Sequence, residues 1–133
     1  FTDGVKTIQN TSLMSRIMNS AKDLGCLIMQ HAEDYHLAKN GMINSGIIAT
    51  KLGLSGIPDI AERIIIERDL TLLEKTKCRY HISQISSAKT LVQLGADLAT
   101  GAPVSGFTTP TAWNFSAESF IAGAWPRPFS VIT

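Results

Sequence analysis

The sequence predicts an α/β fold in which parallel strands alternate with helices. Residues 26–29 form a short unbroken apolar run, which is typical of a strand covered on both faces. Residues 77–86 form a second strand, in which apolar side chains recur at alternate positions. Helical patterns precede and follow both runs. This alternation is typical of right-handed βαβ units that build a parallel sheet.

The composition is that of a folded domain with no strong preference for a charged partner. The chain has 133 residues, 44% of them hydrophobic and 17% charged, with a formal net charge of +1. This length suffices for one domain, and the charge gives no electrostatic reason to expect nucleic acid or an anionic membrane as a partner. Without a signal peptide or a long apolar run, a cytoplasmic protein is expected.

Both cysteines support that expectation. Cys26 and Cys78 lie in apolar, strand-like runs, and neither has a CxxC partner. Buried free thiols of this kind are usual in a reducing compartment.

The first part of the chain is predicted to form a strand end, a helix and the first strand. Phe1 and Thr2, followed by an Asp-Gly pair, look like the end of a strand that enters a turn. Residues 11–24 carry apolar side chains at helical spacing, so a helix is predicted there, ended by Gly25. After the central strand we expect a polar loop over residues 33–40, with His36 in solvent.

The second part of the chain predicts three helices around the second strand. Short and long helices are expected over residues 47–52 and 58–75, and another over 88–98 after a Ser-Ser cap. Arg68 falls in the apolar stripe of the long helix, so either its stem covers apolar surface or its guanidinium meets a buried carboxylate. Asp59 and Arg63 are expected to form an i,i+4 pair on the outer face.

Two residues at strand ends are candidates for chemistry. His31 directly follows the apolar run, and the carboxyl ends of parallel strands face the ligand in α/β folds. It could be a metal ligand or an acid/base group, or a polar loop residue without a chemical role. Asp3 occupies the same kind of position, although spacing alone favours a turn Asp that bonds its own backbone.

Several motifs, in this order along the chain, resemble dihydroorotases of the long-barrel type found in multifunctional complexes. The most specific is Leu-Gly-Leu-x-Gly-Ile-Pro at 52–58, followed by Ala-Glu at 61–62 and Arg-Asp at 68–69. The others are Phe-Thr-Asp-Gly at 1–4, Gln-His-Ala-Glu-Asp at 30–34, Met-Ile-Asn-Ser-Gly at 42–46 and Tyr-His-Ile-Ser-Gln-Ile-Ser at 80–86. The resemblance covers residues 1–94.

The resemblance implies part of a metal-dependent TIM barrel. Such barrels need about 250 residues, so residues 1–95 are expected to span the end of barrel strand four through helix six. The start at Phe1, without a Met, also suggests a fragment. Residues 96–133 are nearly uncharged and lack a regular period, so we interpret them as an irregular tail. A shifted reading frame or a truncated gene is one hypothesis for a tail that is not native to the fold.

The family's zinc ligands are a His-x-His pair on the first strand, an Asp or carboxylated Lys on the fourth, and a His on each of the fifth and sixth. By resemblance, Asp3 and His31 match the fourth-strand and fifth-strand ligands. Gln84 occupies the place of the sixth-strand His, and an amide oxygen is a poor zinc ligand. His81 lies three residues earlier and is expected on the other face. Two ligands are fewer than the three that a catalytic zinc site needs.

Two functions follow from the resemblance. The chain is expected to be a fragment of a zinc-dependent dihydroorotase, which interconverts dihydroorotate and carbamoyl-aspartate in pyrimidine synthesis, and to be inactive by itself. Alternatively, it is a fragment of a non-catalytic dihydroorotase-like subunit that assembles with aspartate carbamoyltransferase, a reading that Gln84 favours. The open sheet edges of a partial barrel also predict self-association into a homo-oligomer.

Overall fold

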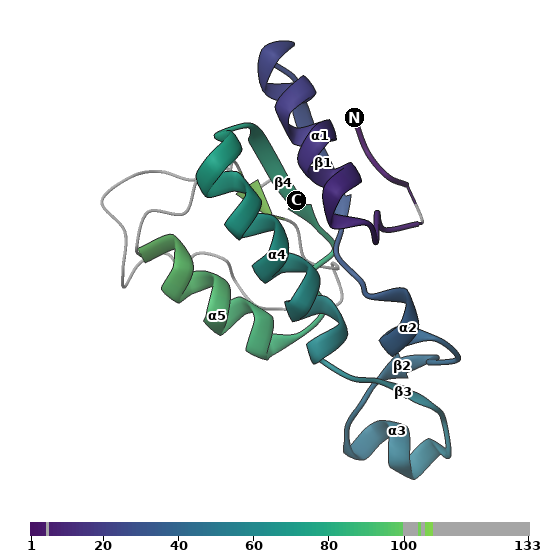
Figure 1. Ribbon diagram of the computed structural model, residues 1–133. Coiled ribbons are helices and arrows are strands. Elements are labelled where there is room, and N and C mark those ends of the chain that lie inside the picture. Colours follow the sequence, from purple (N-terminus) through teal and green to yellow (C-terminus); the bar gives the residue numbers. More distant parts are fainter. Residues whose placement is uncertain (5, 100–103, 105, 108–133) are drawn as a thin grey trace.

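The computed structural model describes residues 1–4, 6–99, 104 and 106–107, and shows helices packed on one side of a small sheet (Figure 1). Helices and strands follow one another along the chain. They are α1 (Thr11–Asp23), β1 (Leu27–His31), α2 (Tyr35–Ala38), β2 (Ile43–Asn44), α3 (Ile47–Leu52), β3 (Gly56–Ile57), α4 (Ile60–Thr76), β4 (Arg79–Ser83), α5 (Ala88–Ala99) and β5 (Gly106–Phe107).

The main sheet is parallel and keeps the order of the chain. Its strands lie in the order β1-β4-β5, and each neighbouring pair is parallel. Thr2 adds a parallel bridge to Met29 on the free side of β1. Four successive chain segments therefore lie side by side, linked by helices, which confirms the predicted α/β class with parallel strands.

The core lies between this sheet and its helices. Alternate residues of β1 and β4, among them Ile28, Tyr80 and Ile82, are buried in one cluster with α1 and α4. Met14 and Met18 of α1 are fully buried there, and each such side chain contributes about 1.5–3 kcal/mol. Leu27, Met29 and His31, with their β4 partners, consequently occupy the opposite face of the sheet.

Local signals explain where the two long helices begin and end. The Asn10 side chain accepts the Leu13 N–H at 2.8 Å and caps α1, which stops before Gly25 at φ +65°. Helix α4 ends at Thr76, where Lys77 adopts φ +57°. Its observed start is two residues later than predicted, because Pro58 lies in the preceding turn and accepts the Ala61 N–H.

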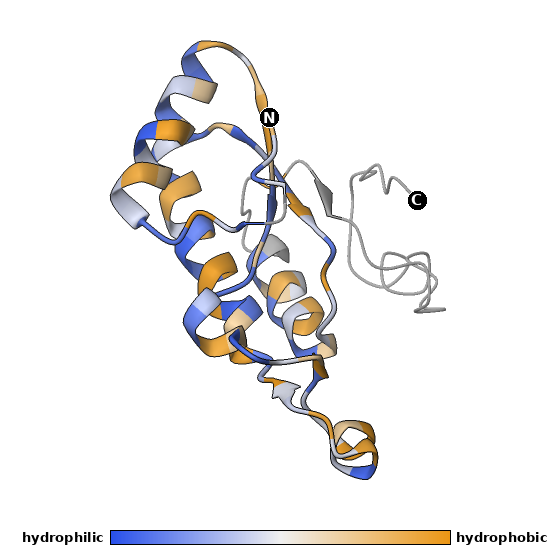
Figure 2. Ribbon diagram, turned by 90° about the vertical axis from the view of Figure 1, so that its right-hand side faces the viewer, coloured by the Kyte–Doolittle hydropathy of each residue, from blue (hydrophilic) through white to orange (hydrophobic). Residues whose placement is uncertain are grey.

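A small excursion projects from one end of the molecule (Figure 1). It consists of β2, α3 and β3, with β2 and β3 paired in parallel. Ile47, Ile48 and Leu52 of α3 are 75%, 64% and 61% exposed, and apolar colouring is prominent on this helix in Figure 2. The helix was predicted, but two-residue strands are too short to show a period in the sequence.

The structure decides the predictions made for the Asp59–Arg63 pair and for Arg68. The Asp59–Arg63 pair is wrong, because Asp59 lies before the helix and pairs with Lys89 of α5 at 3.1 Å. Arg63 instead pairs with Glu67 one turn later, at 3.4 Å. Arg68 takes the second of its two predicted roles, since its guanidinium lies 2.7 Å from an oxygen of the buried Asp69.

Regular structure continues past the boundary predicted at residue 95. Helix α5 runs to Ala99, Val104 is buried in the core, and β5 pairs with β4. An irregular tail was predicted here because so short a strand carries no period. The remainder of the predicted tail, residues 108–133, lies outside the described residues. Among those that are described, no helix is both long and apolar enough to cross a membrane.

Candidate functional site

Asp3 and His31 lie together at the carboxyl ends of neighbouring parallel segments. The Phe1 carbonyl accepts the Met29 N–H at 2.7 Å, which aligns the first residues with β1. Two residues further on, the His31 N–H donates to Asp3 Oδ1 at 3.2 Å. The structure therefore brings together the two residues that the sequence singled out, although 28 positions separate them.

Each of these two side chains keeps a buried polar atom without a hydrogen-bond partner. These atoms are Asp3 Oδ2 and His31 Nδ1. Burial raises the pKa of Asp3, and the His31 backbone N–H opposes this shift by stabilising the carboxylate. Buried polar atoms that lack a protein partner are the kind that a metal ion, a substrate or water satisfies.

His81 lies on the same face of the sheet as His31. In the register of the sheet, His81 pairs with Met29 and His31 pairs with Ser83. Strand β4 ends at Ser83, and Gln84 after it has a left-handed backbone with φ +60°, so the alternation of the strand does not continue to Gln84. His81 is 3% exposed, its Nε2 has no hydrogen-bond partner, and burial lowers its pKa.

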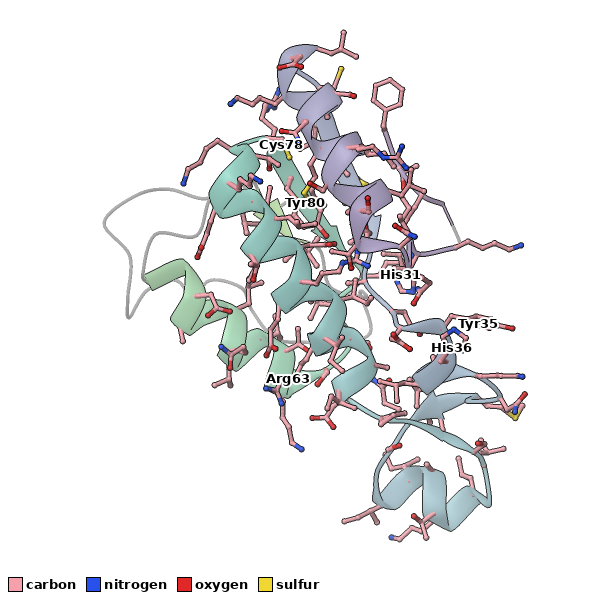
Figure 3. The ribbon with its side chains drawn as sticks, viewed as in Figure 1. His31, Tyr35, His36, Arg63, Cys78 and Tyr80 are labelled. Carbon is pink, nitrogen blue, oxygen red and sulfur yellow. The ribbon has the colours of Figure 1, made fainter. Side chains whose placement is uncertain are left out.

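His36 is exposed on α2, as predicted, and its ring meets the Tyr35 ring edge-on at a centroid distance of 5.4 Å. Figure 3 shows both side chains directed away from His31. His36 therefore takes no part in the site.

Sequence reasoning missed the role of Glu62. One oxygen of this nearly buried carboxylate accepts the Ser86 N–H at 2.8 Å and the Ser86 hydroxyl at 2.9 Å. The other accepts the Ser87 N–H at 3.3 Å. Glu62 thus anchors the loop that follows Gln84 to α4. The available signal was an acidic side chain in the first turn of an apolar helix, within the Ala-Glu motif.

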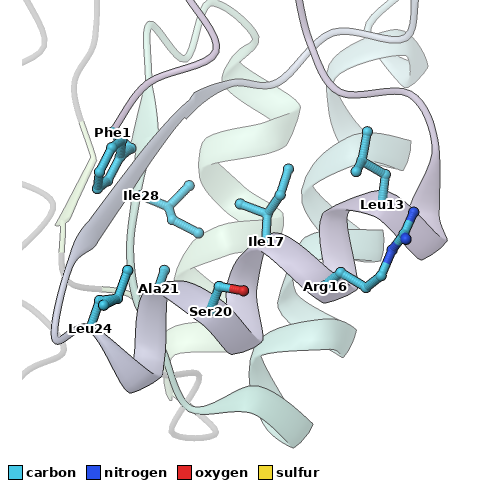
Figure 4. Close-up of a pocket in the computed structure, with 8 residues that line it drawn as sticks. All are labelled: Phe1, Leu13, Arg16, Ile17, Ser20, Ala21, Leu24 and Ile28. Atoms are coloured by element: carbon cyan, nitrogen blue, oxygen red, sulfur yellow. The ribbon is translucent and has the colours of Figure 1, made fainter.

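Two hollows border the N-terminal segment. The larger, of about 370 Å³, is mostly apolar and runs between Phe1, Ile28 and the exposed side of α1 (Figure 4). The smaller, of about 240 Å³, has Asp3 and Gln30 in its lining. Gln30 is 1% exposed, and neither of its amide atoms has a hydrogen-bond partner.

Asp3 and His31 suit a metal ion as donors, but as an incomplete set. No group of three or more His, Cys, Asp or Glu side chains gathers around a common point within the described ranges. A catalytic zinc ion takes three protein ligands. The described residues therefore provide at most two neighbouring ligands, and no reaction step can be built from them alone.

Known proteins with similar sequences indicate the family of the chain that carries Asp3 and His31. Residues 1–90 match the family model described as Dihydro-orotase-like. The chain is 38% identical over 109 residues to a dihydroorotase from Syntrophobacter fumaroxidans, covering 82% of this chain and 25% of that protein. It is 40% identical over 111 residues to a dihydroorotase from Ehrlichia chaffeensis, covering 83% and 25%.

The similarity also extends into the region set apart as a tail. A dihydroorotase from Anaeromyxobacter dehalogenans is 31% identical over 129 residues, which is 97% of this chain and 30% of that protein. At 129 of 133 residues, this match includes most of residues 96–133.

Solved structures agree at the level of the fold. A D-hydantoinase (dihydropyrimidinase) from Thermus sp. superposes with a TM-score of 0.58 at 21% identity, covering 75% of this chain and 22% of that one. An L-hydantoinase from Arthrobacter aurescens gives a TM-score of 0.54 at 18% identity. The chain spans about a quarter of the length of the curated relatives that it matches. With the family model matched over residues 1–90, the chain belongs to the dihydroorotase-like family.

Proposed function

We propose that this chain is part of a zinc-dependent cyclic amidohydrolase that interconverts dihydroorotate and carbamoyl-aspartate, from the end of barrel strand four through helix six. The observation that carries the proposal is the corner made by Asp3 and His31 in a chain of this family. Since the described residues supply two donors, we expect the 133-residue chain to be inactive without the rest of the protein. Free thiols at Cys26 and Cys78 support a cytoplasmic location.

In this proposal, Asp3 would hold the metal with its carboxylate, whose Oδ2 has no hydrogen-bond partner while Oδ1 accepts the His31 N–H. His31 contributes its imidazole. Zinc, when bound, supplies Lewis acidity toward the carbonyl of a cyclic amide. His81 lies on the same face, opposite Met29, and burial lowers its pKa, which favours an uncharged ring.

The test compares zinc content and turnover of dihydroorotate in two proteins. One is the 133-residue chain and the other is the product of the complete reading frame that contains it. We expect stoichiometric zinc and turnover in the complete protein alone. His31→Ala should abolish both, whereas His36→Ala, which changes an exposed histidine five positions away, should preserve both. Turnover by the short chain, or activity that survives His31→Ala, would contradict the proposal.

A second candidate function rests on Gln84. An amide at the position of a ligand is expected in a dihydroorotase-like subunit that has lost catalysis and serves to assemble aspartate carbamoyltransferase. In that case the complete protein should lack zinc and turnover, yet co-sediment with the carbamoyltransferase of its own source. Zinc in a one-to-one ratio, together with turnover, favours the first function instead.

A further inference from the structure

The backbone after β1 is held by side chains, although no described strand continues beside it. Thr7 Oγ1 donates to the His31 carbonyl at 2.5 Å and accepts the Glu33 N–H at 3.2 Å. Gln9 Nε2 donates to the Glu33 carbonyl at 2.8 Å, and its Oε1 accepts the Tyr35 N–H at 3.2 Å. With the bond from the His31 N–H to Asp3 Oδ1, five hydrogen bonds follow one another along residues 31–35.

This pattern reproduces the ladder of a parallel sheet. In such a ladder, every second residue of a strand directs both its N–H and its C=O toward the same neighbour. His31 and Glu33 do so here, and Tyr35 adds its N–H. The bonds also define the Gln9 amide orientation, because a carbonyl needs a donor and an N–H needs an acceptor. The side chains of Asp3, Thr7 and Gln9 act as a surrogate strand, the name we use for these three below.

The surrogate strand is itself fixed from behind by α4. Arg68 Nη1 donates to the Ile8 carbonyl at 2.8 Å and to the Gln9 carbonyl at 3.1 Å. The Nε of the same guanidinium donates to Asp69 Oδ1 at 2.8 Å. Because Arg68 is largely buried and held by a carboxylate, residues 8 and 9 have little freedom to move away from the His31 backbone.

We propose that Thr7 and Gln9 are positioning residues, which hold the backbone of residues 31–35 so that the His31 ring and the free oxygen of Asp3 face a common ligand. The ladder stands on the contacts alone, whereas its role toward a metal ion rests on the proposed function. Substitution of a residue that orients a metal ligand without binding the metal itself typically weakens metal affinity by about 10-fold to 100-fold.

Two NMR experiments test the proposal: amide hydrogen exchange on the 133-residue chain, and zinc titration of the complete protein that contains it. Thr7→Val keeps the shape of the side chain but removes the hydroxyl, so exchange of the Glu33 amide should accelerate at least tenfold. Gln9→Ala should accelerate the Tyr35 amide in the same way and leave Glu33 nearly unchanged. Thr7→Ser should restore protection, and Thr71→Val, which removes an exposed hydroxyl on α4, should alter neither amide.

The zinc titration tests the role in positioning. Zinc should shift the ring nitrogen signals of His31, with at least tenfold weaker affinity in Thr7→Val and recovery in Thr7→Ser. Unchanged exchange at Glu33 and Tyr35 would overturn the surrogate strand, and unchanged zinc affinity in Thr7→Val would overturn its positioning role. If zinc leaves the His31 ring of the complete protein unshifted, the proposed metal function fails, and amide exchange still decides the surrogate strand. Should Thr7→Val not fold, Gln9→Ala provides the same two readouts.

Discussion

Tyr80 donates its hydroxyl to Asp69 Oδ2 at 2.6 Å, between the sheet and α4 (Figure 3). Both side chains are fully buried. Burial raises the pKa of Asp69, and burial together with the Asp69 charge raises the pKa of Tyr80 well above 10. Arg68, on the other oxygen of Asp69, connects this pair to residues 8 and 9. The Arg-Asp motif therefore joins the core to the segment beside the candidate site.

Tyr80→Phe should lower the free energy of unfolding by about 1–3 kcal/mol, because it leaves a buried carboxylate oxygen without a partner. Urea denaturation, monitored by circular dichroism, measures the change. Tyr35→Phe is the matched control, since Tyr35 is 59% exposed, and should remain within about 0.5 kcal/mol of the parent. Equal effects of the two substitutions would show that the buried hydrogen bond contributes little.

His81 predicts a pH dependence of stability. Burial lowers its pKa below the usual 6.5, so between the two values the unfolded chain binds more protons than the folded one. The free energy of unfolding should therefore rise with pH through this window. The contribution of His81 should be fully present above pH 6.5 and should be lost as acid is added. His81→Gln should flatten this part of the profile measured by urea denaturation, whereas His36→Gln should retain it. A profile unchanged by His81→Gln would refute the assignment.

Removal of the Glu62 carboxylate should destabilise the fold more than removal of the Glu67 carboxylate on the same helix. Glu62→Ala removes the acceptor of three hydrogen bonds from Ser86 and Ser87, so we expect a loss of about 1–3 kcal/mol. Amide exchange at both serines should accelerate selectively. Glu67→Ala, which breaks only a pair of partly exposed side chains, should cost no more than about 0.5 kcal/mol. Protection at Ser86 that survives Glu62→Ala would argue against this anchor.

The apolar side chains on α3 give the expected self-association a location. Ile47 and Ile48 are among the most exposed large apolar residues described, and contiguous apolar surface favours association. The pair of substitutions Ile47→Ser and Ile48→Ser should raise several-fold the concentration at which the chain associates, as seen by sedimentation velocity. Val92→Ser, at a similarly exposed site on α5, should have little effect. The reverse ranking would place the contact elsewhere.

Sequence reasoning succeeded where a signal spans several residues. The periods of α1, α4 and β4, together with the caps, indicated the parallel α/β class, and strand ends indicated the corner of Asp3 and His31. It could not detect β2, β3 or β5, which have two residues each. The period of β4 also does not decide where the Gln84 side chain points, since alternation cannot be carried past a left-handed residue.

The surrogate strand was beyond sequence reasoning for a different reason. Thr7 and Gln9 are ordinary polar residues in a loop, and nothing in their spacing indicates a partner more than twenty positions away. Only the path of the chain after β1 brings their side chains against the backbone of residues 31, 33 and 35. The same holds for Glu62 and Ser86, which meet through tertiary packing.

Gln84→His tests whether the missing ligand is what separates this site from a zinc centre. Gln84 follows Ser83, the register partner of His31, and histidine tolerates the left-handed backbone found there. A third nitrogen or oxygen donor beside Asp3 and His31 would complete the minimum set for zinc, so affinity measured by equilibrium dialysis should rise at least tenfold. Gln84→Asn retains an amide and should bind as the parent does. Adding His31→Ala to Gln84→His should remove the gain, because a gain that persisted would mean that the new imidazole binds zinc away from the corner of Asp3 and His31.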